Sequence, residues 1–396
     1  MPVATDPATV GVARRWAMLA VGVLAQGTSA ITINGPAFLI PTLHQKEGLT
    51  LVQASMVAAA PSVGVMLTLI AWGYAVDMLG ERRVLAVGLA GTALAGLVAT
   101  RVHGVVALTV ALFVAGAFGS STSSASGRVV IGWFPAHRRG LAMGIRQMAQ
   151  PLGVGVAAIS IAVVAEKHGV SSALLVPALA SAVALVAVLA VVLDPPRPER
   201  SLTLTPNPYA ESFLWRVHGV SVLLVIPQFA VWTFGLVWLV DARGWSAGAA
   251  GTLIAVSQLV GAAGRITVGH LSDVVGSRMT VLRWVAVAAG LTMALLGGTA
   301  QQGWGVAVVV LVIATTVTVA DNGLAFTAVA ERAGPFWSGR ALGVQNTAQF
   351  LTAAAAAPLA GVAITHWGYP AAFALTALGP LVAVGLVPRD EAAFHD

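Results

Sequence analysis

The sequence predicts an all-α membrane protein with twelve transmembrane helices in two pseudo-symmetric six-helix bundles. Three observations support this prediction: a scarcity of charge, a series of long apolar segments, and a motif that recurs half a chain later. Of 396 residues, 58% are hydrophobic and only 9% are charged, whereas a soluble globular chain typically carries about a quarter charged residues. Charges this sparse cannot cover a chain of this length in water, so most of its surface must lie in lipid.

Composition also narrows the function. The formal net charge is +6, but no run of Lys and Arg indicates nucleic-acid binding. The chain has no Cys, which excludes disulfides and thiolate metal sites. The sequence shows no metal-binding His constellation, no phosphate loop and no nucleophile with its base. We therefore expect no metal, no cofactor and no enzymatic activity.

Long apolar segments define the predicted helices, because a membrane-spanning helix needs about 20 mostly apolar residues. The predicted spans are 16–41, 51–76, 82–101, 104–134, 139–165, 170–193, 216–240, 246–272, 280–300, 303–330, 338–364 and 369–387. A long polar stretch follows the sixth span, with Pro195, Pro196, Pro198, Pro206 and Pro208. We therefore predict an N-terminal bundle at 1–193, a cytoplasmic linker at 194–215 and a C-terminal bundle at 216–396.

The distribution of basic residues predicts the orientation, since Lys and Arg gather in cytoplasmic loops. With the N-terminus inside, the inner segments contain Arg14, Arg15, Arg82, Arg83, Arg138, Arg139, Arg197, Arg200, Arg216, Arg278, Arg283, Arg332, Arg340 and Arg389. The outer segments contain only Lys46, Arg101, Lys167 and Arg243. This bias predicts a multi-pass inner-membrane protein with both termini in the cytoplasm.

A loop motif repeats at an offset of 196 residues. Its matching positions are Gly73 with Gly269, Asp77 with Asp273, Gly80 with Gly276, and Arg82 with Arg278. Each copy follows the second helix of its half. Glycine permits a close helix approach, Asp can pair near a helix end, and Arg can anchor the turn at the headgroups. A second match, between 140–150 and 339–349, has an offset of 199. Two matches at nearly equal offsets indicate an internal repeat, which is common in transporters.

These motifs resemble those of the major facilitator superfamily. The segment 73–83 resembles that family's signature loop between helices two and three, 269–278 resembles its weaker copy between helices eight and nine, and 133–140 resembles the entry into the fifth helix. The resemblance implies a monomeric transporter whose central cavity is lined mainly by helices 1, 4, 7 and 10 and opens alternately to each side. Two departures make drug efflux less expected: Leu112 replaces the usual Arg of helix four, and 157–162 lacks the usual Gly-Pro run.

Four ionisable residues fall inside predicted spans, where a charge is costly. Arg128, Arg146 and Arg265 are cations, and Asp321 is the single carboxylate. If they share a cavity, an anionic substrate is the natural neutralising partner. The segment 264–273 also resembles the eighth helix of monocarboxylate and oxalate porters, where an Arg meets the carboxylate. The alternative is that these residues latch the cytoplasmic gate or extend to the interface.

Asp321 has two interpretations of its own. A carboxyl group inside a helix can exchange a proton during the transport cycle, which would make the proton a coupling ion. Alternatively, Asp321 forms a permanent ion pair with Arg128, and coupling then requires another residue.

Uncharged polar residues provide further candidates for the cavity lining. These are Gln26 and Asn34 in helix one, Gln150 in helix five, Gln228 and Trp232 in helix seven, Asn322 in helix ten, and Gln345 and Gln349 in helix eleven. Hydrogen bonding between helices explains any one of them equally well without a substrate.

We therefore predict a secondary transporter that works by alternating access, with a small anion as the favoured cargo and the proton as a candidate coupling ion. Efflux of drugs or lipophiles is the alternative, served by Phe229, Trp232 and Trp238. A sensor or scaffold on the same fold is a third hypothesis, which predicts an additional soluble domain.

Overall fold

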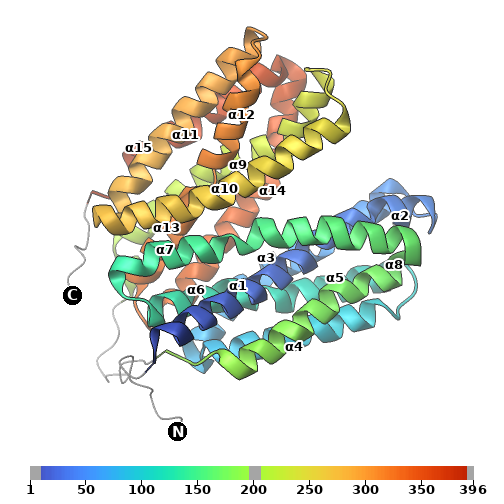
Figure 1. Cartoon of the computed structure of the whole chain (residues 1–396), viewed down its shortest axis with the longest axis vertical. Helices are drawn as coiled ribbons and strands as arrows, with labels where there is room; N and C mark the ends of the chain where they lie inside the picture. Colours follow the sequence, from blue (N-terminus) through green and yellow to red (C-terminus); the bar gives the residue numbers. More distant parts are fainter. Residues whose placement is uncertain (1–9, 196–206, 390–396) are drawn as a thin grey trace. The chain divides into compact units, whose positions relative to one another are not determined.

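The computed structural model describes residues 10–195 and 207–389, so the stretch 196–206 of the predicted linker lies outside the described residues. Within these ranges the chain forms α-helices and short 3-10 helices, and no strand (Figure 1). This agrees with the predicted all-α class.

The first half supplies six helical passes. They are α1 (Val12–Asn34) continued by η2 (Gly35–Leu39) and α2 (Ile40–Gln45); α3 (Leu51–Leu79); α4 (Glu81–Ala99); α5 (Val105–Gly119) continued by α6 (Ser121–Trp133); and α7 (Ala136–Gln147) with α8 (Ala149–Val191), which bends at Gly169 into two passes. The short η3 (Pro208–Ala210) follows the undescribed stretch.

The second half repeats this pattern. Its passes are α9 (Ser212–Asp241); α10 (Ala247–Val275); α11 (Arg278–Gln301); α12 (Val306–Val317) continued by α13 (Asp321–Ala333); and α14 (Ser338–Thr376), which bends at Gly368 before α15 (Leu378–Leu386). Ten stretches of the described chain are long and apolar enough to cross a membrane, and one of them, Ala136–Val191, contains the bend at Gly169.

Local sequence explains where several helices begin. Thr50 and Gln53 form a reciprocal capping box at the start of α3, which satisfies two backbone N–H groups. The Ser246 and Ser277 hydroxyls accept from the backbone N–H groups of Ala249 and Thr280 at the starts of α10 and α11.

Glycine turns recur at the offsets of the sequence repeat. Four pairs have positive φ: Gly48 (70°) with Gly244 (69°), Gly80 (98°) with Gly276 (71°), Gly104 (86°) with Gly303 (68°), and Gly169 (82°) with Gly368 (77°). Glycine adopts such φ values without the steric cost that other residues incur. The offset is 196 for the first two pairs and 199 for the last two. The internal repeat therefore extends to the conformation of individual turns.

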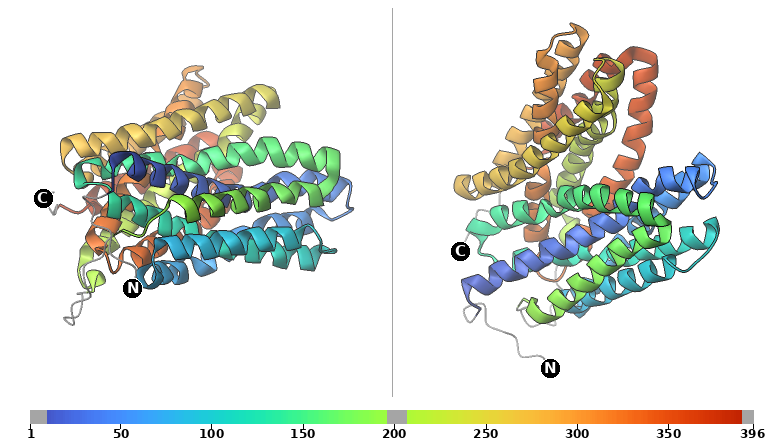
Figure 2. Two further views of the ribbon diagram at one scale, coloured as in Figure 1. Left: turned by 60° about the horizontal axis from the view of Figure 1, so that its bottom comes forward. Right: turned by 45° about the vertical axis from the view of Figure 1, so that its right-hand side comes forward.

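The helices pack into two compact units. Within the described residues, unit 1 comprises 10–134, 148–195 and 333–347, and unit 2 comprises 135–147, 207–332 and 348–389. In unit 1, α8 packs against α1 and α4, and α5 packs against α3 and α4 (Figures 1 and 2). In unit 2, α10 packs against α7 and α12, and α15 packs against α9 and α11. The predicted limits of two bundles and a linker stay a prediction.

Each unit has an apolar core, and apolar side chains also cover its outside. Ile161 and Leu174 belong to the core of unit 1. In unit 2 the rings of Trp238 and Phe373 meet edge to face at 6.0 Å. Large apolar side chains such as Ile159 are mostly exposed on the helices. Apolar exposure on this scale is incompatible with water and suits a lipid-facing surface.

Candidate functional site

Asp77 lies at the centre of a buried ionic cluster in unit 1, which we call the Asp77 cluster (Asp77, Glu81, Arg128, Gly339 and Arg340). Its carboxylate accepts hydrogen bonds from the backbone N–H groups of Gly339 (2.9 Å) and Arg340 (3.0 Å), in the first turn of α14. The Arg340 Nε also donates to it at 3.0 Å. A helix start presents unpaired N–H groups and a partial positive charge, so a carboxylate is a favourable partner there.

Arg128 of α6 belongs to this cluster. Its guanidinium lies 2.8 Å from the Asp77 carboxylate and 3.0 Å from that of Glu81, and it donates to the Pro335 carbonyl oxygen at 2.7 Å. Only 4% of its side-chain surface is exposed. Glu81 was not among the predicted site residues, because it precedes a helix in the signature loop and suggests a solvated position.

Close backbone contact accompanies these bonds. A Cβ atom on Gly73 would overlap the Gly339 carbonyl oxygen, so α3 and α14 approach each other here as only glycine permits. Arg82 acts elsewhere: its backbone N–H donates to the Asp194 carboxylate at 2.8 Å, and its guanidinium to the Leu189 carbonyl oxygen at 2.6 Å. Asp194 therefore attaches the first residues of the predicted linker to the signature loop.

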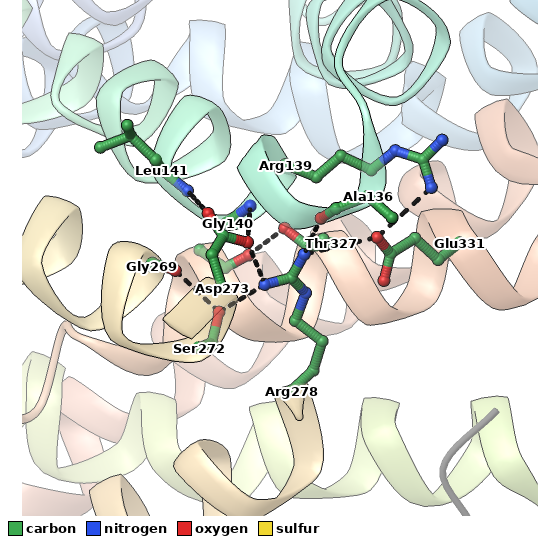
Figure 3. Close-up of polar contacts among 11 residues, drawn as sticks. Ala136, Arg139, Gly140, Leu141, Gly269, Ser272, Asp273, Arg278, Thr327 and Glu331 are labelled. Carbon is green, nitrogen blue, oxygen red and sulfur yellow. Dashed lines mark hydrogen bonds and ion pairs between the residues drawn. The ribbon is translucent and has the colours of Figure 1, made fainter. Parts of the chain in front are cut away.

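Unit 2 contains a repeat-related cluster, the Asp273 cluster (Asp273, Arg278, Glu331, Arg139, Gly140 and Leu141), shown in Figure 3. The Asp273 carboxylate accepts from the backbone N–H groups of Gly140 (3.0 Å) and Leu141 (2.8 Å) in α7. Arg278 donates to the same carboxylate at 2.5 Å and to the Ala136 carbonyl oxygen at 2.8 Å. Figure 3 shows the Arg278 side chain reaching toward Asp273, in the last turn of α10, and toward Ala136 of α7.

Glu331 of α13 completes the Asp273 cluster. Its carboxylate lies 3.6 Å from the Arg278 guanidinium and 3.5 Å from that of Arg139 (Figure 3). This pair is more accessible than the Asp77 ion pairs, with 26% of the Arg139 and 19% of the Glu331 side chain exposed. Gly269 and Gly140 make the matching backbone contact, because a Cβ on either would overlap the carbonyl oxygen of the other.

A second polar site in unit 2 contains two of the predicted arginines. Arg146 and Arg265 are both buried. Arg146 donates to the Gln147 side-chain oxygen at 2.9 Å, and Arg265 donates to the Gln147 backbone oxygen at 2.7 Å. The Arg146 guanidinium also lies 5.8 Å from the centre of the Phe326 ring, within range of a cation–π contact. Gln147 thus joins two cations that the sequence placed in separate helices.

Asp321 belongs to the same polar site. It is buried at the start of α13, where its carboxylate interacts electrostatically with Arg265. A Cβ on Gly323, two residues further, would lie 3.6 Å from the Gly144 backbone and 4.0 Å from the Arg265 carbonyl oxygen. The start of α13 therefore packs directly against α7 and α10. We call Arg146, Gln147, Arg265 and Asp321 the arginine site; its three ionisable groups sum to one positive charge.

Three predicted lining residues form one hydrogen-bond network beside Asp321. Asn322 donates to the Gln228 side-chain oxygen at 3.3 Å, and Gln349 donates to the Asn322 side-chain oxygen at 2.9 Å. Gln349 also donates to the Ser221 hydroxyl at 2.8 Å. The network connects α9, α13 and α14 within unit 2.

The other predicted lining residues lie in both units. In unit 1, Gln26 donates to Ser123 (3.4 Å) and accepts from Thr122 (3.2 Å). Asn34 donates to the Ala30 carbonyl oxygen of its own helix at 2.9 Å. Gln150 is half-buried, and Gln345 is buried in unit 1. Trp232 is half-buried in unit 2, where its ring lies 5.5 Å from that of Phe229.

A family model for the major facilitator superfamily matches residues 22–357. The chain belongs to this superfamily. The match confirms the family that the loop motifs indicated, and with it the predicted fold class of two six-helix bundles. As a member, the chain is a multi-pass membrane protein and a transporter of small molecules.

Among similar proteins is an uncharacterized MFS-type transporter of Mycobacterium tuberculosis (strain ATCC 25618 / H37Rv), 47% identical over 97% of this chain and 86% of the relative. Similar solved structures include the proton:xylose symporter XylE, bound to 6-bromo-6-deoxy-D-glucose, with a TM-score of 0.77 at 14% identity and 95% coverage of both chains. The E. coli fucose:proton symporter FucP has a TM-score of 0.73 at 15% identity, covering 93% of this chain and 97% of its own. At these identities the structural likeness concerns the fold.

Proposed function

We propose that this superfamily member is a secondary active transporter of the inner membrane, with both termini in the cytoplasm, and that it moves a small anion by alternating access. The observation that supports the anion is the arginine site, where Arg146 and Arg265 are buried with one carboxylate, Asp321. Burying unbalanced charge is costly in a membrane protein. An anionic cargo would supply the missing negative charge when it occupies the site.

Arg128 has a different role in this proposal. Its contacts with Asp77 and Glu81 neutralise it without a cargo, so we assign it to a latch at the start of α14. The sequence counted three intramembrane cations against one carboxylate, whereas the arginine site retains two against one. The anion hypothesis therefore depends on Arg146 and Arg265.

Asp321 is the proposed proton-exchanging group. When its carboxyl group is ionised, it competes with an anionic cargo for Arg265. When it is protonated, this competition disappears and Arg265 is available to the cargo. Proton binding and anion binding then favour each other, which is the thermodynamic requirement for coupling two solutes. The neighbouring network of Gln228, Asn322 and Gln349 would hold the start of α13 in place.

Uptake by proteoliposomes tests this proposal. Purified protein is reconstituted, and the uptake of labelled acetate, lactate and succinate is followed with and without an inward proton gradient. We expect uptake of at least one carboxylate, accelerated by the gradient. Arg265→Gln should reduce it by at least about tenfold, since a buried charged hydrogen bond is lost. Arg101→Gln, which removes an exposed cation far along the sequence, is the matched control. Transport of neutral amphiphiles with no carboxylate uptake would contradict the proposal.

The aromatic pair of Phe229 and Trp232 favours a second candidate, the efflux of lipophilic compounds. Such compounds are recognised mainly by apolar and aromatic surface. Growth of a deletion strain on toxic lipophilic cations distinguishes the two functions, because an anion transporter gives no protection.

A further inference from the structure

Two buried polar atoms of the arginine site have no hydrogen-bond partner within the described chain. They are the Nε of Arg265 and the Oδ2 of Asp321. One is a donor and the other an acceptor. Buried polar groups in proteins nearly always have a hydrogen-bond partner. An unpartnered donor and an unpartnered acceptor within one site therefore need an explanation.

Two polar groups near them already have partners. The Arg265 Nη1 donates to the Gln147 backbone oxygen. The Asn322 amide donates to Gln228 and accepts from Gln349. The amide network therefore offers little to a ligand, and recognition depends on the two unpaired atoms.

These atoms belong to neighbouring elements. Asp321 and Arg265 interact electrostatically, and a Cβ on Gly323, two residues after Asp321, would lie 4.0 Å from the Arg265 carbonyl oxygen. A small molecule that contacts Arg265 is thus held beside Asp321. A simple carboxylate would satisfy the Arg265 donor and leave the Asp321 acceptor unpaired.

We propose that the cargo is a small hydroxycarboxylate, whose carboxylate accepts from the Arg265 Nε–H and whose hydroxyl donates to Asp321. This inference rests on the proposed function and specifies its substrate class. A carboxyl group keeps an acceptor oxygen in both protonation states, so the hydroxyl bond is compatible with proton exchange at Asp321.

Charge distinguishes this cargo from an amino acid. An ammonium group could also donate to Asp321, but a zwitterion has no net charge and would leave the positive charge of the arginine site unbalanced. A hydroxycarboxylate has one negative charge for each carboxylate and satisfies both requirements.

The size of the effect follows from the asymmetry of buried hydrogen bonds. A site that holds an unpaired buried acceptor discriminates against a ligand that lacks the matching donor. We therefore expect a hydroxycarboxylate to bind about tenfold to a hundredfold more tightly than the same acid without its hydroxyl.

Matched acid pairs provide the test. The full-length protein in detergent is titrated with glycolate and acetate, lactate and propionate, and malate and succinate, and with alanine as the zwitterion. Binding is measured by the ligand-induced increase in melting temperature. The same titrations follow with Asp321→Asn, which keeps an acceptor oxygen but not the charge, and with Asp321→Leu, which keeps neither.

We expect the hydroxy acid of at least one pair to bind at least about tenfold more tightly than its partner. The preference should weaken in Asp321→Asn and vanish in Asp321→Leu. Equal binding of both acids in every pair that binds, or tighter binding of alanine, would overturn the inference and leave anion transport standing. A preference that persists in Asp321→Leu would overturn the role of Asp321. If no acid of any pair binds, the proposed function fails together with the inference; the wild-type titrations decide this even if a variant does not fold.

Discussion

The Asp77 and Asp273 clusters share one backbone arrangement and differ in the origin of their charges. In both, a carboxylate in the last turn of the second helix of a half accepts two adjacent backbone N–H groups. The donors are Gly339 and Arg340 in one cluster and Gly140 and Leu141 in the other. In both, two glycines bring the backbones into contact. Both halves therefore share the carboxylate, the helix that supplies the two N–H groups, and the two glycines in contact.

The two clusters differ in which element supplies the cation and which supplies the second acid. In the Asp77 cluster the principal cation, Arg128, comes from the fourth pass, and the second acid, Glu81, comes from the start of α4. In the Asp273 cluster the cation Arg278 comes from the start of α11, and the second acid, Glu331, comes from the tenth pass. At the positions equivalent to Arg128 and Glu331 by the 199-residue offset, the chain has Thr327 and Gly132.

This comparison separates what the clusters require from what they tolerate. A carboxylate bonded to two backbone N–H groups occurs in both, whereas the cation comes from the fourth pass of one half and from the start of the third helix of the other. Both arrangements use an acid and a base in addition to the central pair, so each cluster is close to neutral. Electrical balance, and not the source of each charge, is the common feature.

The largest expected effect comes from removing the central carboxylates. Asp77→Asn and Asp273→Asn each leave a buried Arg without its closest partner, which typically costs about 3–5 kcal/mol. We expect both variants to lose stability by a similar amount in detergent unfolding titrations, and to transport poorly in proteoliposomes. If the substitution in one cluster lowers stability by less than about 1 kcal/mol, the two clusters are not equivalent, which contradicts the comparison.

A smaller effect is expected where the backbones touch. Gly73→Ala and Gly269→Ala each place a methyl group against a carbonyl oxygen, and such overpacking typically costs about 1–3 kcal/mol. Gly155→Ala is the matched control, because its Cβ would meet nothing within 4 Å. Melting temperatures of the three variants measure the difference. Equal melting temperatures in all three would show that the close approach is not required.

The smallest effect should come from the accessible ion pair of the Asp273 cluster. Arg139 and Glu331 are partly exposed, and such pairs contribute below about 1 kcal/mol and weaken in salt. Arg139→Gln should therefore lower stability slightly at low ionic strength and hardly at all in high salt. A loss that persists in high salt would mean that Arg139 does not act through a solvent-screened ion pair.

The sequence was sufficient to predict the helical passes and the repeat. Apolar length identified the passes, and the loop motif paired Gly80 with Gly276, since each depends on patterns along the chain. The other three glycine pairs became visible only in the structure. Gln228, Asn322 and Gln349 were each predicted as lining residues. Their mutual bonds were not predictable, because they join residues from three helices that are distant in the sequence.

The sequence did not predict the partners of several charged and polar residues in the site. Glu81 and Glu331 lie at helix ends, where a carboxylate usually meets water, so nothing indicated their ion pairs. Arg128 was counted as an uncompensated cation because Asp77, 51 residues earlier, was assigned to a loop. Gln147 had one available signal, its position next to Arg146, but its backbone bond to Arg265 depends on the packing of α7 against α10.

The offset between paired glycines increases from 196 to 199 residues along the chain, so the two halves differ in length at one place. It places three extra residues between Gly276 and Gly303, where α11 has 24 residues and its counterpart α4 has 19. Three residues lengthen a helix by about 4.5 Å, and the connection after α11 is correspondingly shorter than the one after α4. The internal repeat thus accommodates a length difference of nearly a full helical turn between the two halves at this position.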